Sequence, residues 1–123
     1  MTFPDKPEFV TFEGNRVATW NMGQGPDLVL IHGTPFSSYV WHRVAPDLSD
    51  RFRIRMFDLL GYGRSDKPEG DVSLAVQNRL MTFLFDHWSL TRPLVVAHDF
   101  GGATALRAHL LDGLDYGRLL LID

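Results

Sequence analysis

The sequence predicts an α/β fold with a mostly parallel sheet and helices on both of its faces. Two continuously apolar segments, residues 28–31 (LVLI) and 94–97 (LVVA), have the composition of strands that are buried on both faces. Segments with the apolar spacing of helices alternate with such strands along the chain, and this order is typical of a parallel sheet. Near the N-terminus, two short β-type segments are separated by only two residues, so the sheet is expected to begin with an antiparallel hairpin.

Composition and charge restrict the class of protein. The 123 residues are 45% hydrophobic and suit a single domain spanning residues 1–123. A net charge of −3 without clusters of Lys or Arg argues against nucleic acid or an anionic membrane as a partner. The absence of cysteine excludes disulfides and thiolate metal sites, and no cofactor or metal ion is expected. The N-terminal residues lack the features of a secretory signal, and no apolar segment approaches the ~20 residues of a membrane span, so a cytoplasmic protein is expected.

Six short segments have the composition of strands. They are residues 10–13, 16–21, 28–31, 53–57, 94–97 and 119–122. Gly14 and Asn15 both tolerate positive φ and are expected to form the turn between the first two segments. The last segment is strongly apolar, and an uncovered edge strand of that kind invites pairing with another chain. We therefore expect an α/β fold truncated after its sixth strand, with the rest supplied in cis or by another chain; the alternative is a complete small domain with this strand in the centre.

Three segments have the apolar spacing of helices. The first covers residues 37–48, and Pro46 is expected to break it into two pieces. The second follows Asp71 and Ser73, either of which can cap it. Its apolar face is expected to contain Val76, Leu80, Phe83, Leu84 and Trp88, with Gln77, Asn78, Arg79 and Asp86 outside. The third helix ends at Gly113, a residue suited to a C-cap. Its apolar positions are Ala103, Leu106 and Leu110.

The segment VVAHDFGG, residues 95–102, combines a buried strand, an acidic side chain and the start of a helix. A nucleophile elbow needs small residues two positions before and two positions after the reactive side chain, because backbone approaches backbone there. Ala97 and Gly101 occupy those positions around Asp99. Asp99 is therefore a candidate nucleophile at the carboxyl end of the sheet, beside a helix N-terminus. The alternative from this segment alone is that Asp99 only caps the helix.

A second segment, HGTP at residues 32–35, favours the catalytic interpretation of Asp99. On such a fold, one oxyanion-hole N–H comes from the residue after the nucleophile and the other from the loop after a neighbouring strand. These donors are expected to be the backbone amides of Phe100 and Thr34. The Thr34–Pro35 bond is a candidate for the cis form. Taken alone, the HGTP segment is better explained as an ordinary Gly-Pro turn.

The third segment, FDLLGYGRS at residues 57–65, is a glycine-rich loop after a strand. It lacks the Lys-Ser/Thr pair of a phosphate-binding loop, and no helix begins directly after its glycines. Asp58 is instead expected to hold the loop through hydrogen bonds to backbone amides. In their order and separation the three segments, HG-x-P, D-x-x-G-x-G-x-S and the elbow, resemble the α/β-hydrolase fold family.

An aspartate at the nucleophile position resembles the epoxide-hydrolase and haloalkane-dehalogenase branches of that family. The resemblance implies a two-step reaction, in which the carboxylate attacks an sp³ carbon and a histidine-activated water then hydrolyses the resulting ester. Dehalogenases usually hold the halide with a tryptophan after the nucleophile, whereas this chain has Phe100, which has no side-chain N–H. The resemblance is therefore best to epoxide hydrolases. A haloalkane dehalogenase, an ester or lactone hydrolase, and a non-catalytic binding member of the fold are the alternatives.

The expected substrate is a small apolar epoxide, halide or ester. None of the histidines stands where the family places its catalytic base, so the chain alone is expected to be inactive. His32 is expected to brace the oxyanion turn and His98 to pack beside the elbow. The three other histidines are expected on the helix surfaces, at His42, His87 and His109. Asp123 ends the sixth strand, where some dehalogenases carry the acid that orients the base; a structural role for Asp123 is favoured over this one.

Overall fold

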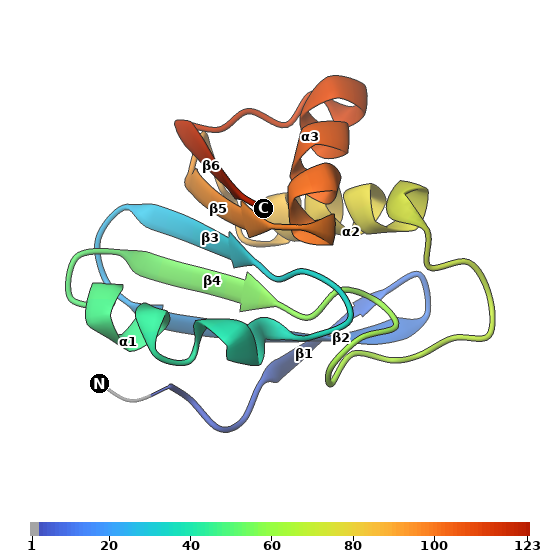
Figure 1. Cartoon of the computed structure of the whole chain (residues 1–123), viewed down its shortest axis with the longest axis horizontal. Coiled ribbons are helices and arrows are strands. Elements are labelled where there is room, and N and C mark those ends of the chain that lie inside the picture. Colours follow the sequence, from blue (N-terminus) through green and yellow to red (C-terminus); the bar gives the residue numbers. More distant parts are fainter. Residues whose placement is uncertain (1–2) are drawn as a thin grey trace.

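The computed structural model describes residues 3–123, and in this range the strands form one six-stranded sheet. In chain order they are β1 (Glu8–Phe12), β2 (Asn15–Gly23), β3 (Asp27–Ile31), β4 (Arg53–Phe57), β5 (Leu94–His98) and β6 (Arg118–Ile122). Their order in the sheet is β1-β2-β4-β3-β5-β6 (Figure 1). β2 is antiparallel to both β1 and β4, and all other neighbouring strands are parallel. The predicted α/β fold with an antiparallel start is confirmed, and β6 lies at the edge of the sheet.

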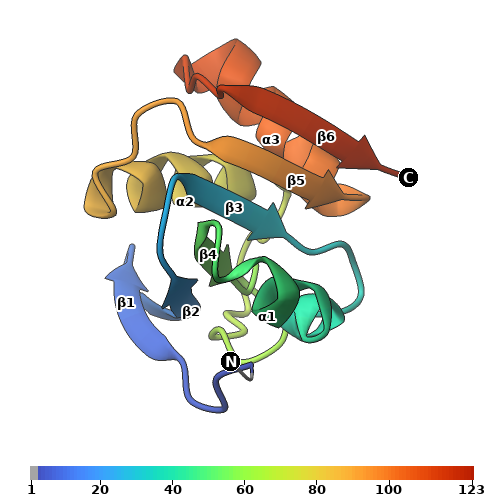
Figure 2. The same ribbon diagram turned by 90° about the vertical axis from the view of Figure 1, so that its left-hand side faces the viewer.

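Helices cover both faces of the sheet, as predicted (Figure 2). The 3₁₀ helix η1 (Ser38–Trp41) and α1 (Val44–Leu48) lie on one face, and α2 (Leu74–His87) and α3 (Phe100–Asp112) lie on the other. Alternate side chains of β3 divide between the two cores: Val29 packs on the side of α2 and α3, and Leu30 on the side of α1. Burial on both faces explains why this strand is continuously apolar. Among residues 3–123, none of the helices combines the length and the apolarity needed to cross a bilayer.

The first hairpin forms as predicted, but its turn lies one residue earlier. Phe12 pairs with Asn15, so the two loop residues are Glu13 and Gly14, with φ of 48° and 82°. A two-residue hairpin turn of this kind needs positive φ at both positions, and glycine suits the second of them. The Asn15 side chain instead donates a 3.3 Å hydrogen bond to the Glu13 carbonyl.

The prediction that Pro46 breaks the segment 37–48 was wrong in position. The segment does divide into two pieces, η1 and α1, but the break falls at residues 42–43. Pro46 lies inside the first turn of α1. There the missing N–H of proline costs no intrahelical hydrogen bond, so the helix accommodates it.

Two polar side chains of α2 that were predicted to lie outside are buried. Gln77 is fully buried and bonds the loop after β4 through both ends of its amide: Nε2 donates to the Leu60 carbonyl at 2.9 Å, and Oε1 accepts the Leu60 N–H at 3.1 Å. Asn78 faces α3, where it donates to Asp112 at 2.8 Å and accepts from Arg107 at 3.1 Å. Because every one of these groups is paired, their burial is tolerated. Simple apolar periodicity does not separate such satisfied amides from surface ones.

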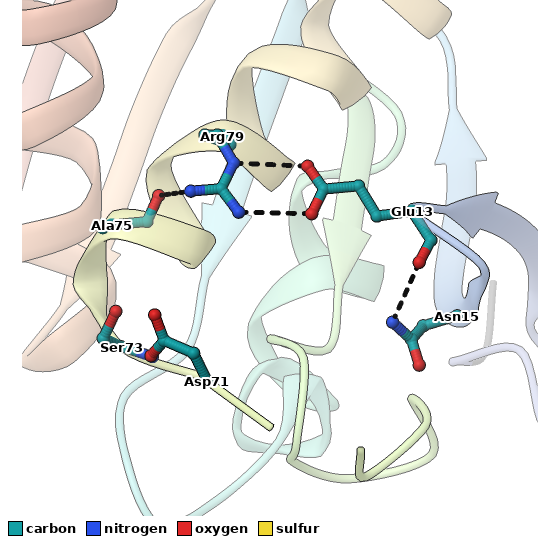
Figure 3. Close-up of polar contacts among 6 residues, drawn as sticks. All are labelled: Glu13, Asn15, Asp71, Ser73, Ala75 and Arg79. Atoms are coloured by element: carbon teal, nitrogen blue, oxygen red, sulfur yellow. Dashed lines mark hydrogen bonds and ion pairs between the residues drawn. The ribbon is translucent and has the colours of Figure 1, made fainter. Parts of the chain in front are cut away.

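The N-terminal part of α2 also binds the first hairpin. Ser73 is the N-cap of α2, yet its side chain makes no capping hydrogen bond; the Asp71 carboxylate instead accepts the Ser73 N–H at 2.8 Å. One turn later, Arg79 donates two 3.2 Å hydrogen bonds to Glu13 in the hairpin turn (Figure 3). This pair holds the hairpin against the helix at the protein surface.

The face of α3 that packs against the sheet and α2 is made of small side chains. Leu106 and Leu110, two of the predicted apolar positions, are 41% and 75% exposed. The buried residues are Gly101, Gly102, Thr104, Ala105 and Ala108. Small residues let the helix approach the sheet and α2 closely. The helix ends at Gly113 with a left-handed φ of 73°, which confirms the predicted C-cap.

Candidate active site

Asp99 is the single residue between β5 and α3. Its φ of 55° and ψ of −117° lie outside the ordinary regions for a residue with a side chain. The surrounding backbone fixes this conformation: the Asp99 N–H donates to the Ile122 carbonyl of β6 at 3.0 Å, and the Asp99 carbonyl accepts from Gly102 and Ala103 in α3. The side chain is exposed and makes no capping hydrogen bond to the helix. Asp99 therefore occupies the N-cap position of α3 without capping the helix through its side chain.

Two glycines allow the turn after β3 to meet the elbow. A Cβ atom on Gly33 would lie 2.7 Å from both the Asp99 Cβ and the His98 Nδ1. A Cβ atom on Gly101 would lie 2.5 Å from the His32 carbonyl oxygen. Both distances are far below van der Waals contact, so the two turns fit together only when these positions lack a side chain. His98 lies beside the elbow, as predicted.

Thr34 faces the Asp99 carboxylate with two donors. Its backbone N–H and its hydroxyl Oγ1 each lie 3.3 Å from the same oxygen, Oδ2. The Thr34–Pro35 bond is cis, as the sequence suggested. The backbone amides of Phe100 and Thr34, in that order of effect, hold the pKa of the Asp99 carboxyl below its ordinary value. Asp99 is therefore an exposed carboxylate that contacts the N–H and the hydroxyl of Thr34 and whose ionised form is favoured.

His32 sets the direction of the Thr34 amide. Its ring is fully buried, with Nδ1 2.7 Å from the Gly33 carbonyl oxygen and Nε2 accepting the Leu59 N–H at 2.9 Å. Since Nε2 is an acceptor, Nδ1 carries the proton and donates to Gly33. The Gly33 carbonyl and the Thr34 N–H belong to one planar trans peptide and point in opposite directions. By holding the carbonyl, His32 turns the N–H toward Asp99, which confirms its predicted bracing role.

Asp58 has the structural role predicted for it. Its buried carboxylate accepts the Ser38 N–H at 2.7 Å and the Arg64 N–H at 2.8 Å. The Asp58 carbonyl accepts the Ser65 hydroxyl at 2.7 Å, and that hydroxyl in turn accepts the Ala18 N–H at 3.0 Å. Asp58 thus joins η1, the glycine-rich loop and β2, and both of its carboxylate oxygens are occupied.

The structure brings Thr34 and Phe100 together around Asp99 and places the other candidates apart. Asp123 is exposed and directly follows Ile122, whose carbonyl binds the elbow amide, so it stands at the same end of the sheet. The remaining histidines lie on or beside helices: His42 caps η1, His87 ends α2, and His109 bonds the Leu114 carbonyl after α3. Within residues 3–123 no three His, Cys, Asp or Glu side chains are grouped as metal ligands.

Sequence analysis missed one functional group at this site, the Thr34 hydroxyl. The residue was chosen for its backbone amide, for which any side chain would serve. The signal was present: a hydroxyl-bearing residue stands between Gly33 and Pro35, two residues that fix the backbone on either side. Only the folded structure shows that this hydroxyl lies 3.3 Å from the Asp99 carboxylate.

Comparisons with known proteins agree with this fold. A family model described as the α/β hydrolase fold matches residues 26–111. A solved α/β-hydrolase fold protein from Burkholderia ambifaria is 55% identical, with a TM-score of 0.94 over 98% of this chain and 44% of that one. A haloalkane dehalogenase from Agrobacterium fabrum is 35% identical over 102 residues, which are 83% of this chain and 32% of that protein. A structure of a proposed epoxide hydrolase from Pseudomonas aeruginosa is 27% identical, with a TM-score of 0.85 over 98% of this chain and 42% of that one. The chain spans about 30% of the length of the curated relatives it matches.

Proposed function

The chain belongs to the α/β-hydrolase fold family, and we propose that it acts by forming and hydrolysing a covalent ester on the Asp99 carboxylate. The observation that supports this most directly is the position of Asp99. It is an exposed carboxylate on a strained turn, with the amides of Thr34 and Phe100 lowering its pKa. A carboxylate needs no base to remove a proton before it attacks, so it suits displacement at a saturated carbon.

In the first step, a lone pair on one Asp99 oxygen forms a bond to the substrate carbon. The carbon–oxygen bond of an epoxide, or the carbon–halogen bond of a haloalkane, breaks at the same time, and its electron pair leaves with the oxygen or the halide. An epoxide oxygen takes up a proton as it leaves, from an acid that is proposed to lie in a lid outside this chain. Because Thr34 holds Oδ2 with both of its donors, Oδ1 is the oxygen that attacks.

In the second step, water attacks the Cγ carbon of the ester. The carbonyl electron pair moves to Oδ2, where the amides of Thr34 and Phe100 stabilise the negative charge. Loss of one such donor typically costs about 100- to 1,000-fold in rate. The tetrahedral intermediate then expels the Oδ1 alkoxide, which receives the proton that the water has lost.

The base that accepts the proton of the water is proposed to come from a segment outside this chain, in the same polypeptide or a second one. His32 is fully buried, and both of its ring nitrogens already bond the backbone. His42, His87 and His109 lie on or beside helices. His98 is half-buried at the end of β5, with its Nδ1 packed against Gly33. Under this proposal, the chain alone can form the ester but lacks the base for efficient hydrolysis, so it has no appreciable turnover by itself.

An epoxide is the proposed substrate class. Phe100 has no N–H to hold a leaving halide, and a structural relative is a proposed epoxide hydrolase. A haloalkane is the second candidate, because the haloalkane dehalogenase from Agrobacterium fabrum is 35% identical. A non-catalytic binding member of the family would form no ester with either class.

The test is mass spectrometry of the protein after reaction with an excess of a styrene-oxide-type epoxide, in water enriched in the heavy oxygen isotope. We expect either an adduct of the epoxide's mass on the peptide that contains Asp99, or heavy oxygen in the Asp99 carboxylate once the ester has turned over. Asp99→Asn should abolish both. Asp86→Asn, on the exposed side of α2, is the matched control and should change neither.

Two outcomes would contradict the proposal. One is undiminished reaction of Asp99→Asn in material that mass spectrometry shows to be free of deamidation. The other is heavy oxygen that appears in the diol from the first turnover onward and never in Asp99, because direct attack of water on the epoxide would give that pattern. The same experiment with a bromoalkane distinguishes the two substrate classes: the class that labels Asp99 faster is the preferred one.

A further inference from the structure

We propose that the Thr34 hydroxyl is a third donor to the Asp99 oxyanion and that it acts in opposite directions on the two chemical steps. It accelerates hydrolysis of the ester and slows its formation. This inference rests on the proposed function, since it concerns the same carboxylate. In the proposed reaction, Thr34 otherwise contributes only its backbone N–H.

The geometry gives Oδ2 two donors from one residue. The Thr34 N–H and the Thr34 hydroxyl lie at the same distance, 3.3 Å, from this single oxygen. Ordinary hydrogen bonds from hydroxyls are shorter, about 2.7 to 2.8 Å. Donors that stabilise a transition state are placed for the position that the oxyanion will occupy, so long contacts to the resting carboxylate are expected.

The Thr34 hydroxyl is held in place by its neighbours. The peptide before Thr34 is fixed by the hydrogen bond from His32 to the Gly33 carbonyl, which also accepts the Phe36 N–H at 3.2 Å. Pro35 restricts the backbone on the other side. Threonine is branched at Cβ, so its χ1 angle has few accessible values. A donor that is already oriented costs little reorganisation when charge develops.

The opposite signs follow from where the negative charge lies in each step. In the resting enzyme the charge is shared between both oxygens of Asp99. During ester formation the carboxylate loses its charge, so the hydrogen bond from Thr34 weakens and retards the attack. During hydrolysis a full charge develops on Oδ2, so the same hydrogen bond strengthens and lowers the barrier.

Two substitutions separate the hydroxyl from the backbone amide. Thr34→Val keeps the shape and the N–H but removes the hydroxyl, and Thr34→Ser keeps the hydroxyl on a smaller side chain. Build-up and decay of the Asp99 ester are followed by rapid quenching and mass spectrometry. For Thr34→Val we expect hydrolysis to slow about 10- to 100-fold, as for the loss of a hydrogen bond to a charged group. Ester formation should become faster, so the ester accumulates, and Thr34→Ser should restore most of the hydrolysis rate.

A second measurement does not depend on turnover. The carboxyl carbon of Asp99, labelled with the heavy carbon isotope, is titrated by NMR in the three proteins. The hydroxyl is one of the groups that lower the pKa of Asp99. Its removal in Thr34→Val should therefore raise this pKa, whereas Thr34→Ser should stay close to the wild-type value.

The results separate this inference from the proposed function. Equal ester lifetimes and equal Asp99 titrations in all three proteins would overturn the role of the hydroxyl while leaving the nucleophile intact. Slowing of both steps together in Thr34→Val, without rescue by Thr34→Ser, would indicate a purely structural role and would also overturn it. Absence of any ester on Asp99 in every variant would overturn the proposed function, and this inference with it.

Discussion

Mild acid should destabilise this protein through one buried imidazole, that of His32. Burial lowers the pKa of His32 below its ordinary value of 6.5. The unfolded chain therefore takes up this proton at a higher pH than the folded protein does. Protonation favours unfolding, so the stability that neutral His32 supports is fully present above pH 6.5 and is lost as the pH falls toward the folded-state pKa.

The loss of stability on protonation of His32 depends on the difference between its folded and unfolded pKa values. Each pH unit between the folded and unfolded pKa values lowers the free energy of unfolding by up to about 1.4 kcal/mol. A protonated ring would also direct its Nε2–H at the Leu59 N–H, which it now accepts at 2.9 Å. That buried amide would lose its partner, at a cost of about 1 to 3 kcal/mol. The cost of this lost hydrogen bond is contained in the pH-dependent loss and is not added to it. A loss of about 1 to 3 kcal/mol should lower the melting temperature by roughly 4 to 12 °C, at about 4 °C per kcal/mol.

The assay is urea unfolding followed by circular dichroism at several pH values from neutral to about pH 5. His32→Gln retains an amide that can reach toward Leu59 but does not titrate, so its unfolding free energy should be lower at neutral pH and depend less on pH. His87→Gln, at the exposed end of α2, is the matched control that leaves His32 in place. Identical pH dependence of wild type and His32→Gln would refute the reasoning.

Two further substitutions test the contacts that hold the loops around the site. Gln77→Leu should lower the free energy of unfolding by about 2 to 4 kcal/mol, because it leaves the buried N–H and carbonyl of Leu60 without partners; a loss below about 0.5 kcal/mol in urea unfolding would contradict this. Arg79→Ala should cost less than about 1 kcal/mol, since Arg79 and Glu13 are each about half exposed (Figure 3). A double-mutant cycle with Glu13→Ala measures this coupling, and a value above about 2 kcal/mol would show that the pair is more than a surface contact.

The fold was readable from the sequence wherever a local pattern had one physical solution. The segments 28–31 and 94–97 are apolar throughout, which suits a strand with helices on both sides, and both form such strands. The hairpin turn was misplaced by one residue because Glu13, which has no special preference for positive φ, occupies a position that the following glycine makes possible. Strand pairing imposes this unfavourable conformation on Glu13, and the amino-acid composition of the turn does not reveal it.

The errors on α2 and α3 have a different cause. Gln77 and Asn78 were placed outside because amides are usually exposed, yet both bond groups that are far away in sequence. Leu106 and Leu110 were placed inside because leucine usually is, yet α3 packs through its glycines, alanines and a threonine. In both helices, tertiary contacts decided which face is buried, and periodicity carries no information about those contacts.

The site shows the same division. Asp99, Thr34 and Phe100 were proposed as site residues from the elbow and HGTP segments together, because an elbow and an oxyanion turn constrain residue size at fixed positions; the structure places Thr34 against Asp99. The direction of each donor was beyond the sequence, since it depends on atoms from four separate segments. Whether Asp99 attacks a substrate remains a prediction for the labelling experiment.

These contacts form a continuous path from the core to the reacting oxygen. Gln77 holds the backbone of Leu60, the neighbouring Leu59 amide fixes the tautomer of His32, and His32 holds the Gly33 carbonyl. Because that carbonyl and the Thr34 N–H share one rigid peptide, the buried imidazole determines where the oxyanion donor points. The Thr34 N–H is fixed in direction, so it can stabilise charge on Asp99 only while the carboxylate keeps its position. That position depends on the backbone hydrogen bonds from Asp99 to β6 and α3. If Asp99 acts as proposed, its reactivity is coupled to the stability of the sheet edge, and a substitution that loosens the path should slow ester hydrolysis more than ester formation.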